Sequence, residues 1–153
     1  MSEIKVEAPP GEWNLGEDAD RYEDPLLDCL IQVARLHGRA ASRTGLSSGL
    51  PLVHNRLTVE LFSRAAARAD LAARVVKKPL AKIPFMQLPA VLLLKEKQAC
   101  VLVDNRSSDG RLKILIPEAG MGEKIVPREE LEQLYFGYAI FVRPKFRMAK
   151  GAG

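Results

Sequence analysis

The stretch "DPLLDCLIQVARLHG", residues 24–38, carries the signals that decide how this chain folds. Asp24 is of a type that caps helix N-termini, and Pro25 suits the first helical position because no backbone donor is needed there. Apolar residues then recur at intervals of three and four positions, and Gly38 is a typical residue just beyond a helix end. The stretch therefore predicts a helix with one buried face.

The same stretch contains Cys29 and His37, two residue types that cysteine peptidases use together. Cys29 lies at the end of the first turn, where the helix dipole has little effect on a thiol pKa. Eight residues of helix span ~12 Å, so His37 cannot pair with Cys29 on one rigid helix. We therefore interpret Cys29 as a buried packing residue, Cys100 as a packing residue within a strand, and His54 as a solvated loop residue.

Length and composition limit the other possibilities. A chain of 153 residues, 47% hydrophobic and 27% charged, predicts one globular domain with a real core. No run approaches the ~20 apolar residues of a membrane-spanning helix, and the polar start does not resemble a secretory signal, so a cytoplasmic domain is expected. Two cysteines and two histidines without metal-ligand spacing predict neither a disulfide framework nor a metal site, and we expect no cofactor.

Charge is unevenly distributed along the chain. Residues 1–24 hold eight acidic and two basic residues, a net charge of −6, which leaves +10 for the remainder. The abundance of Glu, Asp, Pro and Gly predicts a flexible acidic arm over residues 1–23. The basic body favours an acidic partner, such as nucleic acid, anionic lipid or an acidic polypeptide. Nucleic acid is not expected, because we find neither a Gly-rich phosphate loop nor basic residues interleaved with exposed aromatic ones.

The remaining sequence predicts helices and short strands in a simple order. Helices are expected over 42–48 and 58–70 and after Pro127, and strands over 72–78, 90–95, 98–105, 111–117 and 138–144. Helices at the front and adjacent antiparallel strands at the back predict an α+β fold, with the helices on one face of an antiparallel sheet and the N-terminal helices packed on that sheet.

The order of these elements resembles the N-terminal domain of bacterial ABC exporters related to the bacteriocin-processing cysteine peptidases. Those peptidases are papain-like and cut leader peptides after a double glycine, so the resemblance, over residues 24–144, implies a papain-like cysteine peptidase fold. They carry a segment of the form D-C-G-x-x-C-L. Here "DPLLDCL" fits this form with Cys29 and Leu30 as the second Cys-Leu pair, which places Pro25 at the catalytic cysteine.

The other catalytic positions of the resemblance differ as well. In "LPAVLLLKEKQACVLV" Gln98 stands where the catalytic histidine is expected, and in "IPEAG" Ile116 stands at the aspartate. The glutamine of the oxyanion hole falls near Ala19. Proline, glutamine and isoleucine supply no thiolate, base or orienting carboxylate, so we expect no catalytic residue and no enzyme. The degenerate positions Pro25, Gln98 and Ile116 are instead candidate substrate-binding residues.

The sequence is most similar to the sequences of type I secretion exporters of large repeat-containing adhesins. This resemblance implies a non-catalytic domain at the cytoplasmic face of the bacterial inner membrane, which tethers an unfolded calcium-binding-repeat protein or adhesin before export. The other implied partners are the transmembrane and nucleotide-binding domains of the same transporter, with residues 145–153 as a basic linker toward the former. Calcium-binding repeats are Asp-rich, which agrees with the basic body.

Two alternatives to this substrate-binding function stay open at the level of the sequence. One is a divergent cysteine peptidase that uses Cys29 or Cys100. The other is a regulatory module that docks on the ATPase of the transporter.

Overall fold

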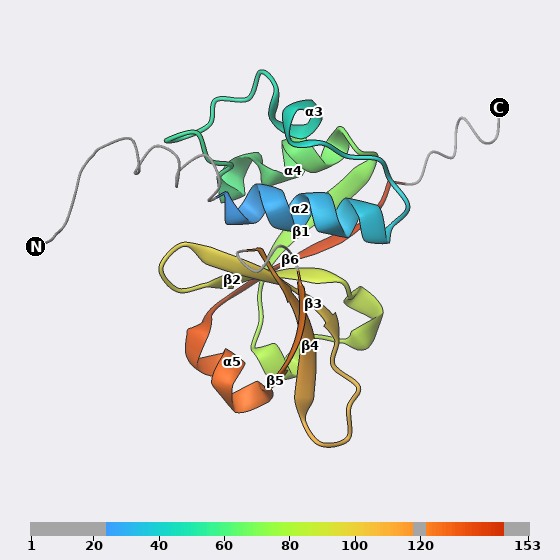
Figure 1. Ribbon diagram of the computed structural model, residues 1–153, viewed down its shortest axis with the longest axis vertical. Helices are drawn as coiled ribbons and strands as arrows, with labels where there is room; N and C mark the ends of the chain where they lie inside the picture. Colours follow the sequence, from blue (N-terminus) through green and yellow to red (C-terminus); the bar gives the residue numbers. More distant parts are fainter. Residues whose placement is uncertain (1–23, 118–121, 146–153) are drawn as a thin grey trace, which may run out of the picture.

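A six-stranded antiparallel sheet forms the centre of the computed structural model, which describes residues 24–117 and 122–145 (Figure 1). The strands are β1 (Leu71–Lys77), β2 (Ala90–Leu94), β3 (Gln98–Asp104), β4 (Arg111–Ile116), β5 (Gly122–Pro127) and β6 (Tyr135–Pro144). Their order across the sheet is β1-β6-β2-β3-β4-β5. The last strand, β6, therefore lies inside the sheet, where it pairs with both β1 and β2.

Four α-helices and two short 3-10 helices complete the described residues. They are α2 (Pro25–Leu36), α3 (Arg43–Ser47), α4 (Val59–Ala67), η1 (Leu80–Lys82), η2 (Phe85–Gln87) and α5 (Arg128–Leu134). The side chains of Asp24, Ser42 and Thr58 cap the first three α-helices by accepting a backbone N–H of the first turn. Gly38, with φ +77°, follows the end of α2 in the left-handed conformation that glycine adopts without strain.

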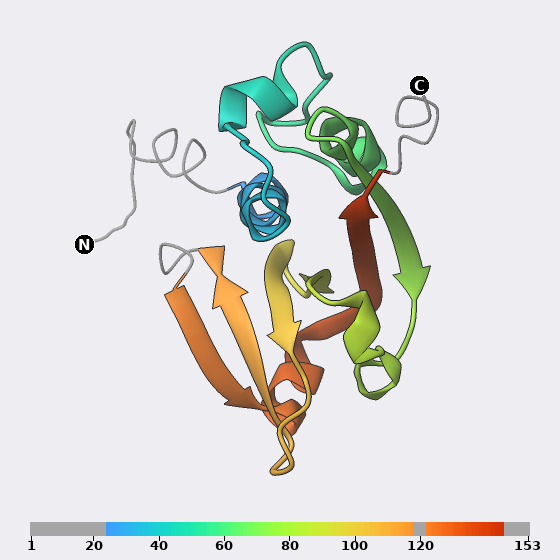
Figure 2. The ribbon, with the colours of Figure 1, turned by 90° about the vertical axis from the view of Figure 1, so that its right-hand side faces the viewer.

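The two faces of the sheet carry separate hydrophobic clusters, because successive side chains of a strand point to opposite faces. In β3, Ala99 and Val101 face the cluster that α2 and α4 complete. Cys100 and Leu102, the alternating neighbours, face a second cluster that includes Leu131 of α5. Figure 2 looks along α2 and shows this helix above the middle of the sheet.

The α+β class and the packing of the N-terminal helices on an antiparallel sheet are confirmed, with two differences. First, not every helix lies on one face: α5 covers the opposite face through Leu131. Second, β5 was not predicted, because it is an edge strand whose buried residue is Val126 alone. The predicted arm over 1–23, which includes Ala19, lies outside the described residues. So do residues 146–153 of the linker predicted over 145–153.

Gly137 permits an unusual backbone conformation within β6. Its φ is +104°, a conformation that is strained for any residue with a Cβ atom. A Cβ atom at this position would meet no other atom within 4 Å. The pairing of β2 with β6 shifts register beside it, between Leu92 and Leu94. We expect Gly137→Ala to lower the free energy of unfolding by about 1–2 kcal/mol through backbone strain alone. Urea unfolding monitored by circular dichroism measures this loss, and an unchanged midpoint would contradict it.

Candidate peptide-binding groove

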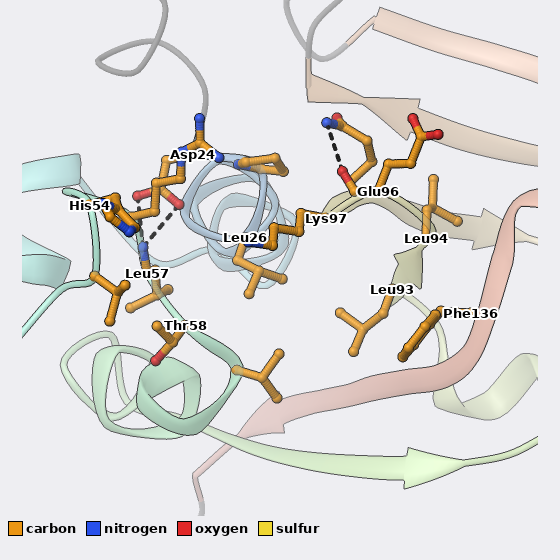
Figure 3. A pocket seen from close by; sticks show the side chains of 15 residues that line it. Asp24, Leu26, His54, Leu57, Thr58, Leu93, Leu94, Glu96, Lys97 and Phe136 are labelled. Carbon is orange, nitrogen blue, oxygen red and sulfur yellow. Dashed lines mark hydrogen bonds between the residues drawn. The ribbon is translucent and has the colours of Figure 1, made fainter. Parts of the chain in front are cut away.

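A groove of about 600 Å³ lies where the start of α2 meets the segment before α4, the β2–β3 turn and the start of β6 (Figure 3). We call it the α2 groove. Its apolar lining residues come from α2, the segment before α4, the end of β2 and the start of β6, and they include Leu26, Val53, Leu57, Leu93, Leu94 and Phe136. Segments far apart in the sequence thus build one concave surface at the helix N-terminus.

Asp24 fixes one wall of the α2 groove. Asp24 is 2% exposed, and its carboxylate accepts the backbone N–H of Leu57 at 3.1 and 3.0 Å and that of Leu27 at 3.4 Å. Burial raises the pKa of Asp24, while the hydrogen bonds from Leu57 and Leu27 oppose this shift. A single side chain thus caps α2 and also holds the segment before α4 against the helix.

Aromatic and aliphatic side chains form the opposite end of the α2 groove. Phe136 is 60% exposed and lies beside Leu93 in Figure 3, and its ring centroid is 6.0 Å from that of Tyr138. The start of β6 is held in place by the Tyr135 hydroxyl, which donates to the Lys78 carbonyl at 2.6 Å, and burial raises the pKa of Tyr135 to about 12. A large apolar surface is therefore presented to solvent on a fixed strand.

Charged and polar groups border this apolar surface. His54, Arg56 and Lys97 line the α2 groove together with Glu96. Lys97 extends from the β2–β3 turn toward Leu26, and His54 lies in a turn with a φ of +53° (Figure 3). An apolar floor with polar groups at its border suits an extended peptide, whose side chains enter the groove while its backbone meets the polar groups.

The structure brings together two of the three residues that the sequence predicts for substrate binding. Pro25 and Gln98 both line the α2 groove, and the Gln98 amide donates to the Glu96 carbonyl at 3.4 Å. Ile116 does not line it. This residue belongs to a crevice of about 300 Å³ under α5, which Gln98 also borders. Ile116 shares the face of Ile114, whereas Leu115 between them contacts the α2 side of the sheet.

Sequence reasoning missed the residues that make up most of the groove surface. Leu93 and Phe136 are brought together only by the pairing of β2 with β6, which no local pattern reveals. His54 was interpreted as solvated, and it is exposed, but it also lines the groove. Phe136, an aromatic residue two positions before the predicted strand 138–144, was the one signal that could have pointed here.

Both cysteines lie away from the α2 groove surface. Cys29 is 0% and Cys100 is 1% exposed, as the packing interpretation expected. Cys100 borders the crevice under α5. Within residues 24–117 and 122–145, no three His, Cys, Asp or Glu side chains are grouped so that they could hold a metal ion. In the same part of the chain, no helix has the length and apolar character needed to cross a membrane.

Residues 19–147 match the model of the peptidase C39 family. A solved N-terminal peptidase C39 like domain, from the toxin secretion ATP-binding protein of Vibrio parahaemolyticus, is 38% identical. The match covers 80% of this chain and 98% of that domain, with a TM-score of 0.77. No curated protein sequence matches significantly.

Two more distant structures share the fold. The peptidase domain of Streptococcus ComA, described as a bi-functional ABC transporter, is 21% identical with a TM-score of 0.68, over 80% of this chain and 92% of that one. A double glycine motif protease from an AMS/PCAT transporter, solved with a leader peptide, is 14% identical with a TM-score of 0.67, over 80% and 85%.

These matches correct the expectation that the chain is not an enzyme. The matching family is a family of peptidases, and the similar structures are peptidase domains or are described as like them. The expectation depended on the residue types at Pro25, Gln98 and Ile116. Residue types at three positions do not outweigh membership in a peptidase family.

Proposed function

The chain belongs to the peptidase C39 family and is similar to domains of ABC transporters, and from this premise we propose that its α2 groove binds an extended segment of an exported protein. The observation that carries the proposal is the groove itself. It joins an apolar floor, with Leu93 and Phe136, to a polar border at the start of α2. Peptide recognition requires both features, because apolar pockets select side chains and polar groups orient the backbone.

We further propose that the exported protein is acidic and unfolded when it binds, as an Asp-rich calcium-binding repeat protein or adhesin is without calcium. The described residues include 19 Lys and Arg and 11 Asp and Glu, a net charge of +8. A basic domain attracts such a chain at long range. Binding is expected to be weak and sensitive to salt, because an unfolded partner loses conformational entropy on binding and exposed charges are screened.

The proposed place of this interaction is the cytoplasmic face of the bacterial inner membrane, where the domain holds the substrate for the transmembrane and nucleotide-binding domains of the same transporter. The chain leaves the sheet at the end of β6, beside Arg143 and Lys145. Basic residues next to a transmembrane segment are attracted to the anionic lipids of the cytoplasmic membrane surface.

An NMR titration tests both the partner and the surface. The probe is a synthetic Asp-rich repeat peptide in calcium-free buffer, added to the isotopically labelled chain. Shifts are expected at groove residues such as Leu57, Leu93 and Phe136, and they should weaken as salt is added. The matched control is the same peptide with Asn in place of Asp. No perturbation at millimolar peptide would refute the proposal.

Phe136→Ala is expected to weaken binding of that peptide about 3- to 10-fold, because an aromatic contact is worth about 1 kcal/mol. Phe136 is 60% exposed, so the substitution should leave the fold intact. Ile125→Ala is the matched control, since Ile125 is 57% exposed on a strand and lies outside the α2 groove. Isothermal calorimetry measures both variants, and equal affinities would show that the peptide binds elsewhere.

Cleavage of the bound peptide is the second candidate function, and family membership is the observation that favours it. The cysteines of the chain, Cys29 and Cys100, do not line the α2 groove. Mass spectrometry of a double-glycine leader peptide after incubation with the chain tests this candidate. Cleavage products, together with adducts of a thiol-directed inhibitor on either cysteine, would assign peptidase chemistry. An intact peptide and an unmodified protein would count against it.

A further inference from the structure

We propose that the acidic arm, residues 1–23 of this chain, docks in the α2 groove and occupies it when no other peptide is bound. The arm joins the described residues at Asp24, and both Asp24 and Pro25 line the groove. A segment of 23 residues thus starts at the border of an open apolar surface.

Charge favours the arm as the occupant. Residues 1–23 hold seven acidic and two basic residues, a net charge of −5, against +8 for the described residues. Within the α2 groove, Arg56 and Lys97 supply two positive charges near the point where the arm begins, against the one negative charge of the exposed Glu96. Asp24 is 2% exposed and its carboxylate accepts backbone N–H groups, so it offers little repulsion to an acidic segment.

The arm also carries side chains that fit an apolar floor. Trp13 and Leu15 lie eleven and nine residues before Asp24. An extended chain covers roughly 3.3 Å per residue, so nine residues reach about 30 Å, which is ample for a groove that starts at Asp24 itself. Leu93 and the exposed ring of Phe136 offer these two side chains an apolar and aromatic surface.

Tethering makes even weak docking effective. A short linker gives an effective concentration on the order of 1 mM, so an arm with an intrinsic Kd of about 1 mM would occupy the groove about half of the time. A substrate peptide would then have to displace the arm. Its apparent affinity would be about twofold lower than for an empty groove.

Trp13 is the sole tryptophan of the chain, so its fluorescence reports the arm directly. In the wild type we expect emission at shorter wavelength and about twofold weaker acrylamide quenching than in the urea-unfolded chain, because the arm occupies the groove about half of the time. Phe136→Ala and Lys97→Glu should each shift the emission to longer wavelength and increase quenching. Added salt should act in the same direction, because it screens the attraction.

Two control variants make the result specific to the groove. Ile125→Ala removes an apolar side chain of similar exposure, and Lys77→Glu makes the same change of charge as Lys97→Glu on a strand outside the α2 groove. Neither should change Trp13 fluorescence. A wild-type Trp13 quenched as fully as in the unfolded chain would overturn the proposal, and so would equal effects of groove and control variants.

This inference is separate from the proposed substrate, because Trp13 is read with no peptide present. A protected Trp13 with no binding of an Asp-rich repeat would uphold arm docking and refute the proposed substrate. Where both hold, the double variant Trp13→Ala and Leu15→Ala should bind that repeat about twofold more tightly than the wild type. Unchanged affinity of the double variant would mean that the arm does not occupy the peptide site.

Discussion

Replacing Asp24 with alanine is expected to lower the free energy of unfolding by about 2–4 kcal/mol. An exposed helix cap contributes about 1 kcal/mol, and a buried donor left without a partner costs about 1–3 kcal/mol more. Asp24 is 2% exposed and accepts the N–H groups of both Leu27 and Leu57, so alanine leaves two donors unpaired inside the protein. Peptide binding should weaken as well, because the segment that carries Leu57 forms one wall of the α2 groove.

Urea unfolding with two comparison variants separates the parts of this effect. Ser42→Ala removes an exposed cap bonded to the Gly45 N–H at 3.0 Å, and it should cost no more than about 1 kcal/mol. Asp24→Asn keeps one acceptor oxygen and removes the buried charge, so it should cost less than Asp24→Ala. Hydrogen exchange at the Leu57 amide should accelerate in Asp24→Ala. Equal losses of unfolding free energy for Asp24→Ala and Ser42→Ala would contradict the role of Asp24 in holding the segment before α4 against α2.

The pH dependence of stability should carry the sign of a raised pKa. Burial raises the pKa of Asp24 above its usual 3.8. The positive charge of Arg43 lowers this pKa, and the negative charge of Asp28 raises it further. Between the unfolded and folded pKa values the folded chain holds more protons at this site, so stability falls as pH rises through that window and then levels off. The wild type should lose stability relative to Asp24→Asn as pH rises from below 3.8. A relative gain would mean that the Asp24 pKa is lowered.

Local signals predicted the elements that local interactions determine. The cap at Asp24, the proline at Pro25 and the glycine at Gly38 bracket a helix that the structure places at Pro25–Leu36. The edge strand β5 gives no such signal, because Gly122, Glu123 and Lys124 are exposed and nothing in their order alternates. Its place depends on pairing with β4, a tertiary interaction that outweighs propensity.

Two residues of the α2 groove could be predicted, because they stand at positions of the family motif. The alignment with that motif places Pro25 at the helix start and Gln98 just after the β2–β3 turn, and both residues line the groove. Ile116, the third candidate substrate-binding residue, lies outside the α2 groove, on the face of the sheet that carries Ile114. The contact of β2 with β6 that exposes Phe136 beside Leu93 depends on long-range register.

Both thiols should react with a disulfide reagent at least about 1,000-fold more slowly in the folded protein than in urea. Cys29 and Cys100 are 0% and 1% exposed, so modification requires opening of the core. Opening that costs about 5 kcal/mol, the low end of domain stability, leaves fewer than about one molecule in 1,000 accessible. Stopped-flow absorbance measures the rate, and Cys29→Ala and Cys100→Ala assign it to each thiol.

The outcome bears directly on whether the family's chemistry operates through these residues. A nucleophilic thiol has to meet the peptide, and burial in apolar surroundings also raises a thiol pKa and lowers the thiolate fraction. Fast modification of one thiol in the folded protein would contradict its burial and give the peptidase candidate a nucleophile. Slow modification of both, in a chain that nevertheless cleaves a leader peptide, would require a nucleophile other than cysteine, because Cys29 and Cys100 are the two cysteines of the chain.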